Sequence, residues 1–237
     1  MTVSYTKTIV CLANSRKPPS GRCVAGREVL SHGFGGWIRP VSARPTQEIS
    51  EEERRYENGR DPRVLDVVSI KMRRPQPQEH QQENHLIDDG YYWARQDAVN
   101  WQDLQKAVED PAGSLWLNGP SSSHGHNDRV PEDRLSSLNR SLYLVRPDGL
   151  RLIVAPEGGD FGPERRRVRA EFHLCGHLYR IVVTDPWIES KCLAKPDGEI
   201  PLKNALLCVS LGETFHGFAY KLAAAVITPR RAQRARS

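Results

Sequence analysis

The sequence lacks long apolar runs, so we expect no membrane-spanning helix. No stretch of the 237 residues approaches the roughly 18 to 20 consecutive apolar residues that such a helix needs. The N-terminal segment also lacks the basic-then-apolar order of a secretory signal and is typical of a first strand. Cysteine is sparse and odd in number, with 5 residues, too few for a disulfide scaffold. The sequence therefore predicts a cytoplasmic protein with no membrane contact.

Apolar residues are also relatively few, at 38% of the chain, which indicates cores of modest size. The 18 glycines and 17 prolines are spread along the whole chain and are not concentrated in one segment. This spacing is typical of many short elements joined by turns, and it favours a β-rich architecture over a helical one. The length allows one large domain or two small ones of about 100 residues each.

The net charge is +5, but basic and acidic residues are distributed unevenly along the chain. Residues 1–45 carry 7 basic and 1 acidic side chains, residues 46–136 carry 11 and 18, and residues 137–237 carry 16 and 10. The basic excess therefore belongs to the two ends of the chain. If the ends fold beside each other, they form a positive face suited to a polyanion. The alternative is an ordinary arginine-rich surface.

Hydrophobic patterning predicts a mainly β fold with short helices. Strands are expected within 3–14, 35–42, 63–74, 84–96, a hairpin at 140–157, 165–185 and 204–227, and short helices within 46–59, 100–110 and 185–195. We interpret the chain as two small OB-like β-barrels in tandem, although SH3-like barrels would leave a similar pattern. The predicted segments are a first barrel at 1–112, a Ser/Gly/Pro-rich linker or loop at 113–138, a second barrel at 139–228 and a basic flexible tail at 229–237.

A basic loop between the first two strands is the leading candidate site. Pro18 and Pro19 remove two backbone donors, which argues against a phosphate nest formed by backbone N–H groups. The loop is instead predicted to contact phosphates through side chains, with two residues donating hydrogen bonds and four supplying charge: Asn14, Ser15, Arg16, Lys17, Arg22 and Arg27. The alternative is an exposed turn kept for structural reasons.

Aromatic residues beside cations are candidates for base stacking. Trp37 with Arg39, and Trp93 with Arg95, are two residues apart and would share one face of a strand. Lys221 on the last strand is predicted to join the phosphate contacts. The competing interpretation of both tryptophans is burial in a barrel core.

Metal and catalytic motifs are weak. His173, Cys175 and His177 have strand-like spacing, but the turn expected at Gly176 would break their shared face, so no metal and no cofactor is predicted. Nothing resembles a nucleophile elbow, and no catalytic residues are identified. Whether the protein is an enzyme stays open, and the sequence favours a binding protein.

Two blocks carry a family resemblance. KTIVCLANSRK, GRCVAGRE and GWIRPVS near the start, with CVSLGETFHGFAYKLAAAVI near the end, resemble a bacterial family described as dual OB-domain proteins. The resemblance implies two OB-like barrels and a nucleic-acid or nucleotide ligand, and it supplies no catalytic residues.

The leading hypothesis is a non-enzymatic module that binds single-stranded or structured DNA or RNA, as an accessory factor in bacterial defence or repair. The alternative is a nucleotide or modified-base sensor, or a nucleotide-processing enzyme, with a pocket in or between the barrels. A third possibility is a scaffold whose acidic middle segment, 46–136, docks a protein partner.

Overall fold

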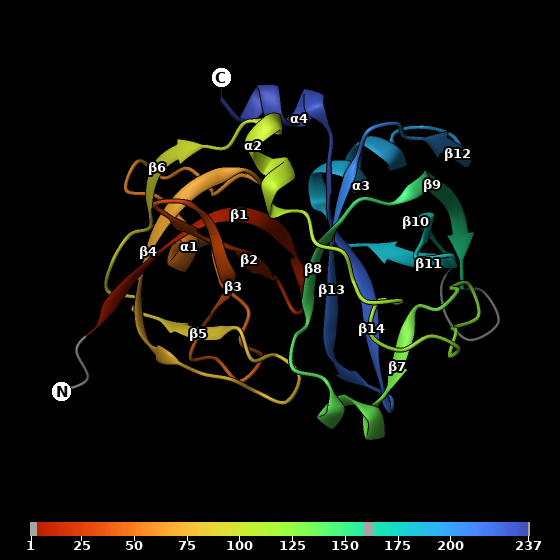
Figure 1. The fold of residues 1–237 in the computed structure, drawn as a ribbon, viewed down its shortest axis with the longest axis horizontal. Coiled ribbons are helices and arrows are strands. Elements are labelled where there is room, and N and C mark those ends of the chain that lie inside the picture. The colour runs from red at the N-terminus through yellow and green to blue at the C-terminus, as the bar shows by residue number, and fades with distance from the viewer. Residues whose placement is uncertain (1–3, 159–163, 237) are drawn as a thin grey trace. The chain divides into compact units, whose positions relative to one another are not determined.

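The computed structural model describes residues 4–158 and 164–236 and is built mainly from β-strands, which confirms the predicted fold class (Figure 1). The chain divides into two compact units. The first unit comprises Met1–Val108, Asn139–Ser141 and Ile227–Ser237, and the second comprises Glu109–Leu138 and Leu142–Val226.

Six strands form the sheet of the first unit: β1 (Tyr5–Lys17), β2 (Gly21–Leu30), β3 (Gly33–Val41), β4 (Asp66–Pro75), β5 (Asn84–Ile87) and β6 (Ala94–Ala98). The strand order is β1-β2-β3-β5-β4-β6, with an additional pairing of β1 with β4. β3 and β5 are parallel, and the other pairs are antiparallel. The first five strands therefore form a circuit of pairings, as expected for a five-stranded OB fold.

Alternation of buried and partly exposed residues along β4 places one face of the strand in the core of the first unit. Val68, Ile70 and Met72 on β4 are buried, whereas the residues between them are partly exposed. Short helices complete the unit: α1 (Glu51–Arg54), α2 (Trp101–Leu104), the 3-10 helix η1 (Gln105–Ala107) and α4 (Pro229–Ala235). A capping box between Ser50 and Glu53 fixes the start of α1.

The second unit contains β7 (Arg129–Pro131), β8 (Leu142–Val145), β9 (Asp148–Glu157), β10 (Arg165–Leu174), β11 (His177–Val183), β12 (Gly198–Pro201), β13 (Leu206–Phe215) and most of β14 (Phe218–Ile227), with the 3-10 helix η2 (Glu132–Ser137) and α3 (Pro186–Leu193). The sheet order is β12-β9-β10-β11-β14-β13-β8, and β7 pairs with β14. β11 and β14 are parallel, which repeats the β3–β5 relationship of the first unit.

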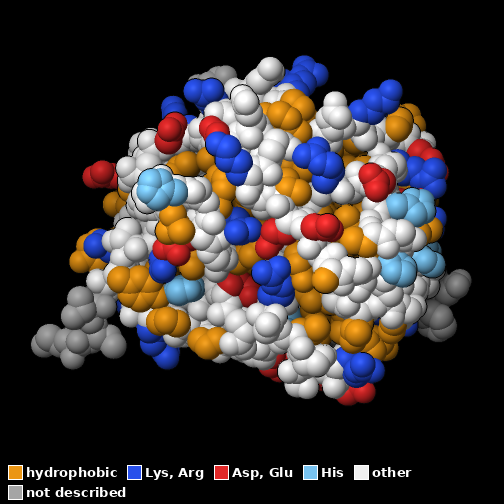
Figure 2. Space-filling view, viewed as in Figure 1, with side chains coloured by type: hydrophobic (Ala, Val, Ile, Leu, Met, Phe, Trp, Pro, Cys, Tyr) orange, Lys and Arg blue, Asp and Glu red, His pale blue; other side chains and the backbone are white. Residues whose placement is uncertain are grey.

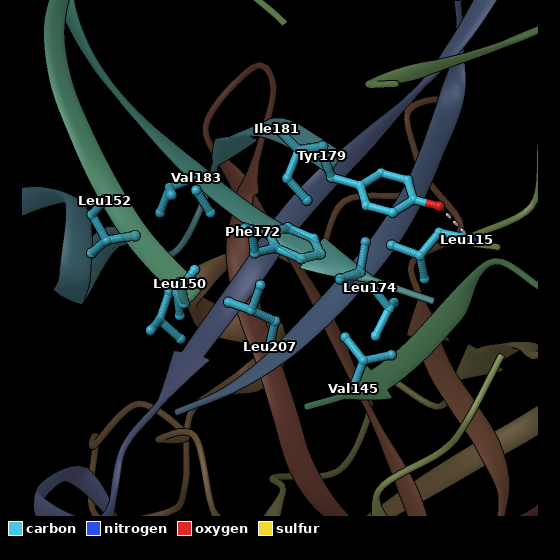
Figure 3. Packing of buried hydrophobic residues seen from close by; sticks show 14 of the residues in the cluster. Leu115, Val145, Leu150, Leu152, Phe172, Leu174, Tyr179, Ile181, Val183 and Leu207 are labelled. Atoms are coloured by element: carbon cyan, nitrogen blue, oxygen red, sulfur yellow. Dashed lines mark hydrogen bonds between the residues drawn. The ribbon is translucent and has the colours of Figure 1, made fainter. Parts of the chain in front are cut away.

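The core of the second unit is a cluster of aliphatic and aromatic side chains from several strands. Figure 3 shows Phe172 and Tyr179 among leucines and valines, with the Tyr179 hydroxyl beside Leu115. The two rings stack with centroids 5.4 Å apart, and Tyr179 Oη accepts from the Leu115 backbone N–H at 3.1 Å. These contacts attach a segment preceding the first strand of the unit to its core.

Three sequence predictions differ from the structure. The hairpin expected at 140–157 does not form, because β8 pairs with β13 whereas β9 pairs with β10 and β12. Pro147 lacks an N–H for a hairpin ladder and lies in the two-residue break between β8 and β9. The segment 113–138 is part of the second unit, because Leu115, Val130 and Leu135 are buried in its core.

The third difference is the C-terminal segment, which was predicted to be a flexible tail. Residues 229–235 form α4, whose first turn is capped by Thr228 through the N–H of Arg231. Ala232 and Ala235 bury their methyl groups in the first unit. Small apolar residues three apart were sufficient for a buried helical stripe, and the arginines on either side of Ala232 concealed it. Ser237, the last residue of the predicted tail, lies outside the described residues.

Candidate nucleic-acid interface

The β1–β2 connection of the first unit gathers three of the predicted cations, and we call Arg16, Lys17 and Arg22 the basic hairpin. Arg16 is exposed, Lys17 and Arg22 are partly exposed, and a turn at 18–20 joins their strands. Arg16 lies directly opposite Arg22 in the antiparallel register. Residues directly opposite each other in an antiparallel pair have neighbouring side chains, so this register places two of the three cations close together. OB folds use the loop between their first two strands to bind oligonucleotides.

Asn14 and Ser15, predicted as hydrogen-bond donors to phosphate, both donate to backbone carbonyls of the first unit. Asn14 Nδ2 donates to the Pro62 carbonyl at 2.8 Å, and Ser15 Oγ donates to the Cys23 carbonyl at 3.4 Å. Ser15 is 4% exposed. The single Ser15 hydroxyl donor and one of the two Asn14 amide N–H donors are therefore used by backbone acceptors within the first unit.

The second predicted group, around Trp37, is largely buried. Trp37 is 8% exposed, and the Arg27 guanidinium lies 5.9 Å from its ring centroid. Arg27 Nε donates to the Gly35 carbonyl at 2.6 Å. Arg39 is buried, donates to Ser141 Oγ at 2.8 Å and lies 3.3 Å from Glu83 Oε1. The predicted stacking pair of Trp37 and Arg39 is therefore wrong, because both side chains are enclosed by protein.

Trp93 and Arg95 are also not a stacking pair. Trp93 is 3% exposed and belongs to the core of the first unit. Its backbone forms an isolated bridge with Tyr56, and β6 begins only at Ala94, so the strand alternation assumed for the pair does not hold. Arg95 donates to Asp66 Oδ1 at 2.9 Å and to the Ala235 carbonyl at 3.0 Å.

Lys221 is a buried structural residue of the second unit and not a phosphate contact. It is 1% exposed, and its Nζ donates to the Leu117 carbonyl at 2.6 Å. The ammonium lies 5.0 Å from the Tyr179 ring centroid. Burial lowers the pKa of Lys221 to about 7, against the opposing effect of the Asp128 carboxylate.

Sequence reasoning missed a charged surface of the second unit. On β10, Val168, Ala170, Phe172 and Leu174 face the core. The alternate positions carry charged or polar side chains on the opposite face: Arg165, Arg167, Arg169, Glu171 and His173. We call the β9–β10–β11 surface formed by Arg151, Arg165, Arg167, Glu171 and Arg180 the basic strand face. The period-2 alternation in RRRVRAEFHL could have revealed it from the sequence alone.

Glu171 organises the basic strand face. Arg151 from β9 donates through Nε to Glu171 Oε1 at 2.7 Å, and Arg180 from β11 donates through Nε to Oε2 at 2.5 Å. Burial alone would raise the pKa of Glu171, but the hydrogen bonds from Arg151 and Arg180 outweigh it and lower the pKa below its usual value. The side chains of Arg151 and Arg180 are 46% and 42% exposed, so both guanidinium groups are held in place yet open to solvent.

Arg169 extends the ion-pair network on β10. Its guanidinium donates to Glu157 Oε1 at 2.6 Å and Oε2 at 3.0 Å, and it lies 3.4 Å from Asp128 Oδ2. Because Arg169 is buried between two carboxylates, its charge is balanced internally. Arg169 therefore offers little charge to a ligand.

Neither a metal cluster nor a membrane helix is found among residues 4–158 and 164–236. No group of three or more His, Cys, Asp or Glu side chains there has an arrangement that could hold a metal ion. The described helices are all too short and too polar to cross a bilayer. Cys175 Sγ, in the motif with His173 and His177, lies 3.3 Å from the Pro111 carbonyl, with which it forms a weak hydrogen bond.

Basic side chains do not form one continuous patch on the face drawn in Figure 2, where Lys and Arg lie among acidic and hydrophobic groups. Ligand contacts must therefore be located from individual residues.

No curated protein and no solved structure matches this chain. A family model described as dual OB-containing domain matches residues 7–226. The chain belongs to the family of proteins with a dual OB-containing domain.

Proposed function

We propose that this protein is a nucleic-acid-binding module whose second unit contacts backbone phosphates through the basic strand face. The observation that carries the proposal is the arrangement of Arg151 and Arg180 on Glu171. OB folds bind oligonucleotides on the surface of their second and third strands. The order β9-β10-β11-β14-β13 of the second unit parallels β1-β2-β3-β5-β4 of the first, so β10 and β11 correspond to the second and third strands when β9 is counted as the first.

The chemistry of this face suits phosphodiesters. Guanidinium groups bind phosphate oxygens through paired N–H donors, and a group already fixed by a carboxylate loses less conformational freedom on binding. Arg165 and Arg167 are both exposed and lie on the same side of β10 as Glu171. Phosphate contacts position a nucleic acid without reading its sequence, so we expect binding with little sequence preference.

The basic hairpin is proposed as the phosphate contact of the first unit. Arg16 and Lys17 end β1, and Arg22 is the second residue of β2, so three cations lie around one short turn. This placement retains the central element of the sequence prediction. The aromatic contacts proposed with it no longer include Trp37 or Trp93, since both are buried.

The proposal is tested by fluorescence anisotropy with labelled single-stranded and duplex DNA and RNA at low salt. The variant R165Q/R167Q removes two exposed charges from the basic strand face, and K106Q is the matched control because Lys106 is an exposed cation paired with Asp103 in the first unit. We expect R165Q/R167Q to bind about tenfold more weakly and K106Q to bind like the wild type. Absence of binding by the wild type, or equal loss in both variants, would contradict the proposal.

Thermal-shift measurements with a set of nucleotides test the alternatives of a nucleotide sensor or a nucleotide-processing enzyme. A mononucleotide that binds the folded state tightly raises the melting temperature. We expect oligonucleotides, and no mononucleotide, to stabilise the protein at comparable concentrations. Stabilisation by a mononucleotide alone would favour a small-ligand pocket over the phosphate-binding surface.

A further inference from the structure

Two adjacent tyrosines in the first unit are exposed in a way that the fold does not require. Tyr91 and Tyr92 lie in the turn between β5 and β6 and are 54% and 53% exposed, whereas the next residue, Trp93, is 3% exposed. The turn is ordered by backbone hydrogen bonds from Asp88 N–H to the Lys71 carbonyl at 2.9 Å and from Tyr91 N–H to the Asp88 carbonyl at 3.3 Å. Two large rings are thus held at the surface by an ordered turn.

Each ring has a cation of its own. The Lys71 ammonium, from β4, lies 5.9 Å from the Tyr91 ring centroid, and the Arg55 guanidinium, at the end of α1, lies 5.7 Å from the Tyr92 ring centroid. These separations are within the range of cation–π attraction. Three elements of the first unit therefore converge on one aromatic pair flanked by positive charge.

Two nearby acids, Asp88 and Asp89, are partly offset by a third cation. Arg73 on β4 lies 3.4 Å from Asp88 Oδ1 and also forms an ion pair with Asp89. The two carboxylates belong to the turn that orders the tyrosines, and their charge is partly offset there. Lys71 and Arg55 leave the aromatic surface net positive.

We infer that Tyr91 and Tyr92 stack unpaired bases of a single-stranded nucleic acid, with Lys71 and Arg55 beside its phosphates. Aromatic side chains combined with cations are the general means by which proteins hold single strands. The inference rests on the proposed function and specifies its ligand class, because it assigns a preference for single strands to the first unit.

The ligand class follows from base geometry. Bases of a duplex are paired and stacked on one another, so their faces are unavailable to a protein ring except at an end. A single strand can turn successive bases onto separate rings. A protein partner would also use exposed tyrosines, but it would give no difference between single-stranded and duplex probes.

The test compares Y91A/Y92A with Y91F/Y92F, which removes the hydroxyls and keeps the rings. Anisotropy is measured with an oligothymidylate strand and with a duplex of equal length. We expect Y91A/Y92A to bind the single strand at least about tenfold more weakly, since each stacked base contributes about 1–3 kcal/mol. Duplex affinity should be unchanged, and Y91F/Y92F should bind both probes like the wild type.

Each outcome of this comparison decides the inference. Unchanged single-strand affinity in Y91A/Y92A, or an equal loss for both probes, would overturn it while leaving the proposed function intact. A wild-type protein that binds neither probe would overturn both. Photocrosslinking to an iodouridine-substituted strand gives an independent readout, in which we expect the crosslinks to map to Tyr91 or Tyr92 and a map confined to other residues would contradict the inference. Because both side chains are exposed, the melting temperature should change little in either variant.

Discussion

Glu171 lies directly opposite Arg180 in the β10–β11 pair, and its Oε2 accepts a hydrogen bond from Arg180 Nε at 2.5 Å. The other oxygen of the same carboxylate accepts from Arg151 of the neighbouring strand β9 at 2.7 Å. One buried acid thus fixes two guanidinium groups, one on each side of it. This arrangement spaces two guanidinium groups across three strands, and the proposed function depends on it.

The first prediction concerns the shape of these groups. R151K/R180K keeps both charges and replaces each planar fork with a point charge, so it tests paired hydrogen bonding separately from electrostatics. We expect nucleic-acid affinity to fall by about fivefold to tenfold, with an unchanged dependence on salt. Affinity equal to that of the wild type would show that charge alone is sufficient. Anisotropy titrations at several salt concentrations provide the measurement.

The second prediction uses the depressed pKa of Lys221, which lies near 7 in the folded protein and at about 10.5 when the chain is unfolded. Between these values the unfolded state binds more protons, so stability rises with pH. We expect the free energy of unfolding of K221M to increase less between pH 7 and pH 10 than that of the wild type. Urea denaturation at a series of pH values measures this difference. Parallel curves for the two proteins would contradict the assignment.

The third prediction concerns Asp66, which is buried and accepts hydrogen bonds from Tyr56 Oη at 2.8 Å, from the Arg63 N–H at 2.9 Å and from Arg95 Nε at 2.9 Å. Y56F removes a hydrogen bond to a charged group and should lower the free energy of unfolding by about 1.5–3 kcal/mol. Y91F is the matched control, because the Tyr91 ring is exposed. Equal stability of the two variants in urea denaturation would show that the Tyr56 hydrogen bond contributes little.

The sequence predicted the strands well where alternation was strong, as at Val68, Ile70 and Met72 of β4. It also identified Arg16, Lys17 and Arg22 around one turn, because short connections keep neighbouring residues together. The basic strand face could also have been predicted from the alternation of β10. The sequence analysis interpreted that segment only as strands and did not consider the arginines at its alternate positions.

Other parts of the candidate site could not be predicted, since burial depends on contacts distant in the sequence. Arg39 is enclosed by an interaction with Ser141, and Lys221 by one with the Leu117 carbonyl. Neither partner is near its cation in the chain, so composition alone made both cations resemble surface residues. Tyr91 and Tyr92 were passed over in favour of Trp93, although the Asp-Asp-Gly turn before them indicates exposure.

The most direct test of the central claim is the salt dependence of binding to a single-stranded oligonucleotide, measured by anisotropy for the wild type and R165Q/R167Q. Phosphate neutralisation makes the logarithm of the association constant fall linearly with the logarithm of salt concentration, with a slope of about −0.7 per phosphate contact. We predict a steep slope for the wild type and a slope shallower by about 0.7 for each arginine removed. Binding that is insensitive to salt, or an identical slope in the two proteins, would contradict a phosphate-binding role for the basic strand face.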